Sequence, residues 1–253
     1  MLASGLATMT SGSTPKAKIA AYFDLDGTLL TVNSGRLWMQ RERRLGRISR
    51  RQSLEATLLF VAYRLSIVDM YAAMHKALAV YRGEREETLA RWTRDWYRDE
   101  VARHAAPGGR AALEAHRRQG RELVLLTSSS PYEARAASEH LGLDELLSSR
   151  YEVAEGLLTG EPVVPLCYGE GKVAYAEEHA RRHGVDLARS YFYTDSYTDL
   201  PMLLRVGEPR VVNPDARLRW FALRRGWPVL DWRGGAAALA PGAPRPPSRH
   251  DDS

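Results

Sequence analysis

Short apolar segments that alternate with helical segments constrain the fold of this chain more than any other feature of its sequence. Segment 19–23 and, after residue 107, segments 121–127, 190–195 and 209–214 have the length and the Val, Leu, Tyr and Phe content of buried strands. The stretches between the later segments place apolar residues at steps of three and four, as amphipathic helices do. Strands that alternate with helices in this way usually pair in parallel, with helices on both faces of the sheet. We therefore predict an α/β fold built on a doubly wound parallel sheet.

Region 34–104 has a different pattern, because almost all of it shows helical periodicity. Its aromatic residues Trp38, Trp92, Trp96 and Tyr97 fit a small core between helices better than a role in stacking on a ligand. The region therefore predicts an all-helical unit between the first strand and the rest of the sheet.

The later part of the chain contains three further structural signals: a chain break, a hairpin and a last strand. Pro107-Gly108-Gly109 is expected to break the chain after the helical unit. Segment 150–166 alternates like a β-hairpin, with its turn expected near Thr159-Gly160. Segment 209–214 is expected to be the last strand.

Composition places the chain among ordinary globular proteins. It has 253 residues, of which 44% are hydrophobic and 26% charged, and a formal charge of +5. Cys167 is the only cysteine, which excludes an intrachain disulfide and agrees with a cytoplasmic location. No apolar run approaches the roughly 18 residues that a membrane-spanning helix needs. We expect a flexible leader over residues 1–18 and a disordered tail over residues 233–253.

The arginine-rich run 41–52 could contact nucleic acid, an anionic membrane or a phosphorylated substrate. A solvated helix face is the more common reading of such a run, since acidic residues are interspersed and no nucleic-acid-binding module is recognisable. We therefore expect no nucleic-acid partner.

Polar side chains follow the expected strands where each one ends. Asp24 and Asp26 follow the first strand, Thr127 and Ser128 the second, and Asp195 a third, with Asp199 four residues further on. In open parallel sheets, ligands bind beyond the carboxyl ends of the strands. We therefore expect these groups to meet in one crevice.

Lys172, near the start of a predicted helix, adds a cation to this set. Oxygen ligands without a Cys or His cluster favour a hard cation such as Mg²⁺ over Zn²⁺. Backbone N–H groups after Asp24 and Thr127 could hold a phosphate, and Lys172 would neutralise both carboxylates and phosphate. Asp24 could then attack phosphorus as a nucleophile, and Asp26 could act as general acid and base. Each residue alone is more often a turn, a helix cap or a solvated charge, and only their combination in this order points to a reactive site.

Four segments together resemble the ordered motifs of the haloacid dehalogenase superfamily: "FDLDGTLL", "LVLLTSSSP", "GEGK" and "YTDSYTDLPML". The similarity is greatest to the phosphoserine-phosphatase-like branch, subfamily IB, and extends from about Ile19 to Trp232. It implies a Rossmann-like core over residues 19–32 and 105–232, with a helical cap over residues 33–104.

The resemblance also implies roles for individual residues. Asp24 matches the nucleophile and Asp26 the general acid and base. Thr127 matches the phosphate-binding hydroxyl, although the sequence "TSSSP" also permits Ser128. Lys172 matches the lysine of the third motif. Asp195 matches the metal-binding acid of the fourth motif and Asp199 its second acid, so that Mg²⁺ would be held by Asp24, the backbone carbonyl of Asp26, and Asp195.

The sequence departs from the family pattern at two positions. The fourth motif usually opens with Gly-Asp, whereas here it is Thr194-Asp195. Phosphoserine phosphatases carry a glutamate shortly after the first motif for the substrate ammonium, and the matching position here is Asn33. A neutral amide cannot pair with an ammonium in the same way, so phosphoserine is one substrate among several.

The resemblance predicts a Mg²⁺-dependent phosphatase that acts on a small phosphorylated metabolite through an aspartyl-phosphate. Phosphoserine, histidinol phosphate, a phosphorylated lipid headgroup and a sugar phosphate all remain open. Two other functions stay as alternatives: a non-enzymatic module that binds RNA or anionic lipid, and a phosphotransferase whose acceptor is not water. The sequence does not fix the oligomeric state.

Overall fold

The computed structural model describes residues 17–48 and 69–233, so the predicted disordered tail and most of the predicted leader lie outside the described residues. Six parallel strands form the main sheet in the order β3-β2-β1-β6-β7-β8. Their bounds are Ala20–Phe23 (β1), Glu122–Thr127 (β2), Glu145–Ser148 (β3), Tyr191–Thr194 (β6), Glu208–Val212 (β7) and Val229–Leu230 (β8). The prediction of a doubly wound α/β sheet is confirmed.

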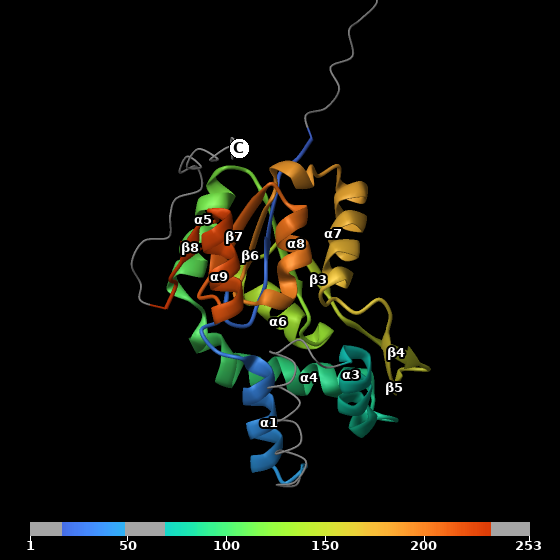
Figure 1. The fold of residues 1–253 in the computed structure, drawn as a ribbon. Coiled ribbons are helices and arrows are strands. Elements are labelled where there is room, and N and C mark those ends of the chain that lie inside the picture. The colour runs from blue at the N-terminus through green and yellow to red at the C-terminus, as the bar shows by residue number, and fades with distance from the viewer. Residues whose placement is uncertain (1–16, 49–68, 234–253) are drawn as a thin grey trace, which may run out of the picture.

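Helices cover both faces of this sheet (Figure 1). On β1, Ala21 and Phe23 pack toward α5 and α6, whereas Ala20 and Tyr22 pack toward α7, α8 and α9. Successive side chains of a strand point to opposite faces, so each strand contributes to two hydrophobic clusters. The helices are Pro107–Arg118 (α5), Pro131–Leu141 (α6), Glu170–His183 (α7), Leu200–Arg205 (α8) and Ala216–Arg225 (α9).

Helices α1 (Ser34–Arg44), α3 (Met70–Leu78) and α4 (Glu86–Trp96) form a separate layer beyond the carboxyl ends of the strands (Figure 1). Trp38 and Trp96 pack edge to face, with ring centroids 4.9 Å apart. Two connections join this cap to the core side by side, since the N–H of Thr31 donates to the carbonyl of His104 and the N–H of Ala106 donates to the carbonyl of Leu29. Part of the predicted helical region, residues 49–68, lies outside the described residues.

The hairpin of β4 (Arg150–Ala154) and β5 (Leu157–Val163) leaves the core and contacts the cap. Its strands pair antiparallel, and β5 packs against α3. Backbone hydrogen bonds join Gly83 and Glu84 to Leu158. The hairpin thus ties the core to the cap on the side opposite the two connections (Figure 1).

The predicted hairpin turn near Thr159-Gly160 is wrong. The turn lies at Glu155-Gly156, where both residues have positive φ, of 50° and 77°. Two consecutive residues with positive φ suit the twist of a tight hairpin. Gly160 lies inside β5 instead, in close contact with the Arg82 side chain.

The predicted break at Pro107-Gly108-Gly109 is confirmed: the helical residues before it end at His104, and α5 begins at Pro107, where Pro occupies a favoured position. Gly108 is required there because a Cβ would lie 2.4 Å from the Trp232 ring. Segment 209–214 is not the last strand, because β8 follows it and pairs with β7.

Candidate active site

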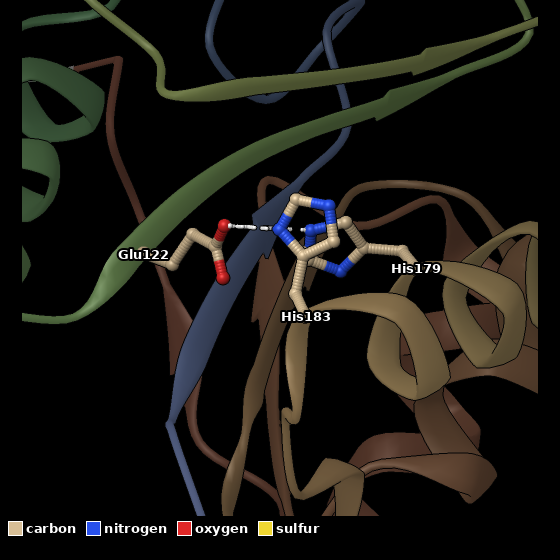
Figure 2. Close-up of side chains that lie close together, drawn as sticks. All are labelled: Glu122, His179 and His183. Carbon is tan, nitrogen blue, oxygen red and sulfur yellow. Dashed lines mark hydrogen bonds and ion pairs between the residues drawn. The ribbon is translucent and has the colours of Figure 1, made fainter.

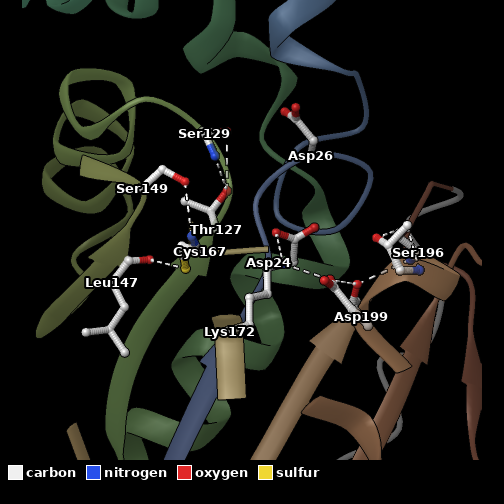
Figure 3. Close-up of polar contacts among 12 residues, drawn as sticks. Asp24, Asp26, Thr127, Ser129, Leu147, Ser149, Cys167, Lys172, Ser196 and Asp199 are labelled. Atoms are coloured by element: carbon white, nitrogen blue, oxygen red, sulfur yellow. Dashed lines mark hydrogen bonds and ion pairs between the residues drawn. The ribbon is translucent and has the colours of Figure 1, made fainter. Parts of the chain in front are cut away.

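The strand ends bring the predicted acidic and hydroxyl residues together. Strand β1 pairs with β2 on one side and β6 on the other, so Asp24, Thr127 and Asp195 follow or end three adjacent strands. All three side chains are buried. Together with Asp26 and Ser128 they line one cavity between core and cap. The predicted meeting of these residues at one crevice is therefore observed. Figure 3 shows Asp24, Asp26 and Thr127 of this set.

Lys172 lies beneath this cavity, in the first turn of α7. Its Nζ donates to Asp24 Oδ1 at 2.9 Å and to Asp199 Oδ2 at 2.7 Å, and its side chain is only 2% exposed. Thr194 Oγ1 donates to the same Asp199 oxygen at 2.6 Å. Burial alone would lower the pKa of Lys172, but the charges of Asp199 and Asp24 outweigh burial and raise it. Lys172 therefore remains a cation.

The carboxyl of Asp24 is held between opposing effects. Burial raises its pKa to about 7, against the charge of Lys172, which lowers it. A further cation at this carboxylate would favour its ionised form. The site is therefore suited to hold positive charge on the side that faces the cavity.

Asp195 lies against the loop that carries Asp24 and Asp26. Gly27 has a φ of +72°, and a Cβ on it would lie 2.3 Å from Asp195 Oδ2. Asn213 Nδ2 donates to the Gly27 carbonyl at 3.1 Å and so fixes the same loop from β7. Asn213 was not predicted from the sequence. Its backbone has a positive φ of 43°, which only a structure reveals.

Asp26 points away from Lys172 and toward the start of α1 (Figure 3). Its Oδ1 accepts from the N–H of Ser34 at 2.9 Å, and its Oδ2 accepts from Asn33 Nδ2 at 3.1 Å. Burial raises the pKa of Asp26 to about 6, while the N–H of Ser34 opposes the rise. Asn33 also caps α1, because its Oδ1 accepts from the N–H of Arg36. The residue at the expected glutamate position thus orients Asp26.

The hydroxyl residues 127–130 that end and follow β2 have two structural roles, one in the loop and one in capping α6. Thr127 Oγ1 accepts from the N–H of Ser129 at 3.2 Å, which bends the loop at the strand end. Ser130 caps α6 by accepting from the N–H of Glu133. Thr127 and Ser128 both line the cavity, so both hydroxyls stay candidates for holding a phosphate.

The cavity has a volume of about 1260 Å³ and is walled by core and cap. Arg36 of α1 lines it, whereas Arg41 forms an ion pair with Glu42 at 2.9 Å. Its aromatic lining comes from Trp38, Tyr81, Trp96, Tyr132 and Tyr151.

Glu133 is a cavity residue that sequence reasoning missed. The sequence Ser130-Pro-Tyr-Glu133 has the pattern of a capping box, which would turn the glutamate back onto the chain. Instead the side chain is buried in the cavity wall, and its Oε1 has no hydrogen-bond partner within residues 17–48 and 69–233. Burial, aided by the charge of Asp26, raises the pKa of Glu133 to about 8.

The donor set fits a hard divalent cation. The carboxylates of Asp24 and Asp195 and the backbone carbonyl of Asp26 offer only oxygen, the ligand type that Mg²⁺ prefers. The contact between Asp195 and Gly27 brings the fourth-motif acid against the loop of the first motif. The residues present are therefore those that a Mg²⁺ site would need.

Comparison with known proteins places this geometry in a family. The family model described as haloacid dehalogenase-like hydrolase matches residues 21–204. A phosphoserine phosphatase of Mycobacterium tuberculosis is 33% identical over 234 residues, covering 89% of this chain and 74% of that protein. A histidinol-phosphatase of Neisseria meningitidis is 28% identical over 221 residues, covering 85% of this chain and 100% of that protein.

The fold agrees with this placement. A Bordetella pertussis crystal structure of unknown function is 27% identical, with a TM-score of 0.77, covering 86% of this chain and 100% of that one. The family model spans the cap, the paired carboxylates and Lys172 alike. The chain belongs to the haloacid dehalogenase-like hydrolase family.

Proposed function

We propose that this phosphatase of the haloacid dehalogenase-like family hydrolyses a small phosphomonoester in a Mg²⁺-dependent reaction through an aspartyl-phosphate. One observation carries the proposal: the Asp24 carboxylate is buried at a strand end, hydrogen-bonded to Lys172, and open to a cavity that it shares with Asp26, Thr127 and Asp195.

The first half-reaction transfers the phosphoryl group to the protein. An Asp24 carboxylate oxygen attacks phosphorus, and the bond from phosphorus to the leaving oxygen breaks. Asp26, whose pKa of about 6 lies near neutrality, gives its proton to that oxygen. Lys172 and the Thr127 or Ser128 hydroxyl neutralise and position the phosphoryl oxygens from the side of the core.

The second half-reaction restores the enzyme. Asp26, now ionised, takes a proton from water as the water oxygen attacks phosphorus, and the bond from phosphorus to Asp24 breaks. Inorganic phosphate leaves. Mg²⁺, when bound by Asp24, the Asp26 carbonyl and Asp195, supplies charge neutralisation at the phosphoryl group. The hydrogen bonds from Ser34 and Asn33 keep Asp26 on the cap side of the site throughout.

Glu133 bears on the choice of substrate. A buried carboxylate oxygen that lacks a hydrogen-bond partner among the described residues, as Glu133 Oε1 does, is costly, and a cationic group of the substrate would offset that cost. We infer that the substrate carries an amine or another cation beside its phosphate, with Glu133 in the role that Asn33 cannot fill. Phosphoserine and histidinol phosphate, for which two relatives are named, both have such a group.

The test is a phosphatase screen of purified protein over phosphomonoesters with and without an amine, each with Mg²⁺ and with EDTA. We expect Mg²⁺-dependent release of phosphate, with higher kcat/KM for the amine-bearing members. Absence of phosphate release from every member, combined with salt-dependent binding of RNA or anionic vesicles, would favour the non-enzymatic alternative.

A further inference from the structure

A second cluster of ligating side chains lies at the opposite end of the sheet from the cavity. It consists of Glu122, the first residue of β2, with His179 and His183 of α7 (Figure 2). Glu122 and Thr127 are five residues apart on one strand, which corresponds to about 16 Å. The cluster is therefore separate from the proposed Mg²⁺ site.

The three side chains converge on one point. The two histidines are four residues apart on a helix and so share a face, with ring centroids 4.3 Å apart. Glu122 Oε1 lies 2.9 Å from His183 Nδ1 and 3.7 Å from His179 Nε2. Ligand atoms around a tetrahedral Zn²⁺ with bonds of about 2.0–2.2 Å are about 3.3–3.6 Å apart, so these separations lie within a few tenths of an ångström of a zinc site.

Two of the polar atoms in this cluster are buried without a hydrogen bond to any part of the chain that the structure describes. His179 is 1% exposed, yet among the described residues its Nε2 has no hydrogen bond and only the 3.7 Å contact with Glu122 Oε1, and the buried Oε2 of Glu122 has no hydrogen bond either. Buried polar atoms are nearly always paired in native proteins, because leaving one unpaired costs free energy. A cation between Glu122 and His179 would satisfy both residues.

Tyr22 supports the ligating form of His179. Its hydroxyl lies 2.9 Å from His179 Nδ1. When that nitrogen carries the proton and donates it to the Tyr22 oxygen, Nε2 keeps a lone pair directed at Glu122 and His183. Burial also lowers the pKa of His179, which favours the neutral ring that a metal requires.

We propose that Glu122, His179 and His183 bind a divalent transition metal, with Zn²⁺ as the best fit. Two imidazole nitrogens and one carboxylate oxygen suit Zn²⁺ and disfavour Mg²⁺. The His183 side chain is 30% exposed, which leaves a fourth position for water. The metal would link β2 to α7, the helix that also carries Lys172, and its role would be to stabilise their packing.

The test measures Zn²⁺ binding by the EDTA-stripped full chain in excess Mg²⁺, by competition with a chromophoric chelator. Co²⁺ serves as a spectroscopic probe, because tetrahedral Co²⁺ absorbs far more strongly than octahedral Co²⁺. We expect about one Zn²⁺ per chain, at least a tenfold loss of affinity in His183→Ala, and a rise of several degrees in the Tm with Zn²⁺ in the unmodified protein but not in His183→Ala.

Two control variants keep the result specific. Asp195→Asn removes a ligand of the proposed Mg²⁺ site and should leave Zn²⁺ binding unchanged. His75→Gln removes a more exposed histidine that pairs with one glutamate, Glu161, at 3.1 Å, and should also bind Zn²⁺ normally. Zn²⁺ bound equally by His183→Ala and the unmodified protein, binding lost in Asp195→Asn, or no binding at all would overturn the proposal.

Discussion

Replacement of Lys172 by Met should destabilise the fold far more than loss of an ordinary lysine. The Nζ is buried and lies 2.9 Å from Asp24 and 2.7 Å from Asp199. At an effective dielectric constant of about 20, each contact is worth roughly 6 kcal/mol, most of which offsets the cost of burying the charges. Removing one member of a buried pair typically costs about 3–5 kcal/mol. Because two carboxylates lose the same partner, we expect the free energy of unfolding to fall by about 4–5 kcal/mol at pH 7.

The expected loss depends on pH, since an unpaired buried carboxylate can take up a proton. Each pH unit below 7 lowers the cost of that proton by about 1.4 kcal/mol. If one additional carboxyl becomes protonated in the variant, the difference in the free energy of unfolding between Lys172→Met and the unmodified protein should shrink. We expect it to be about 2–3 kcal/mol smaller at pH 5 than at pH 7.

Equilibrium unfolding in urea, with EDTA present and Mg²⁺ absent, measures both quantities. Lys18→Met is the matched control, because Lys18 is exposed, and it should change stability by less than about 0.5 kcal/mol. A loss below about 1 kcal/mol for Lys172→Met, or an equal loss at both pH values, would refute the buried-cation reasoning.

Three further perturbations test other parts of the account. Gly27→Ala should lower the affinity for Mg²⁺ at least tenfold, measured by activity against Mg²⁺ concentration, because its Cβ would displace the Asp195 carboxylate; an unchanged Mg²⁺ dependence would contradict that contact. Glu133→Gln should raise KM for amine-bearing phosphomonoesters at least tenfold while leaving KM for p-nitrophenyl phosphate within about twofold, and equal changes for both would count against the cation-binding role. His116 is buried, and burial, together with Arg121 and Arg210, lowers its pKa from 6.5 to about 3. The unfolded state therefore binds the proton more readily, so stability should fall by about 2 kcal/mol from pH 7 to pH 5, and His116→Gln should lose that part of the pH dependence in urea unfolding.

The parallel sheet could be predicted from sequence because its central strands are buried on both faces. Their centres, residues 19–23, 123–126 and 191–193, are therefore continuously apolar and stand out from the helices around them. Strand β3, Glu145–Ser148, escaped prediction because it is a short edge strand with a half-buried pattern. Strand β8 has only two residues, too few for any periodicity to mark it.

The candidate site was predictable where chemistry follows directly on a strand end, as at Asp24 and Asp195. Other partners depend on tertiary packing. That Lys172 meets Asp199, the residue before α8, follows from how α7 and α8 pack, which no local pattern encodes. The place of Glu133 in the cavity was not predicted, because its spacing from Ser130 matches a common helix cap. The described part of the chain contains no helix long and apolar enough to cross a membrane.

The central claim is that Asp24 carries the phosphoryl group during turnover. Acid quenching during steady-state turnover, followed by tryptic digestion and mass spectrometry, tests it directly, since cleavage after Lys18 and Arg36 releases one peptide containing Asp24 and Asp26. We predict an added phosphoryl mass on that peptide, assigned to Asp24 by fragmentation, removed by hydroxylamine as an acyl phosphate should be, and absent from Asp24→Asn. A phosphoryl group on another residue, or wild-type turnover by Asp24→Asn, would contradict the account.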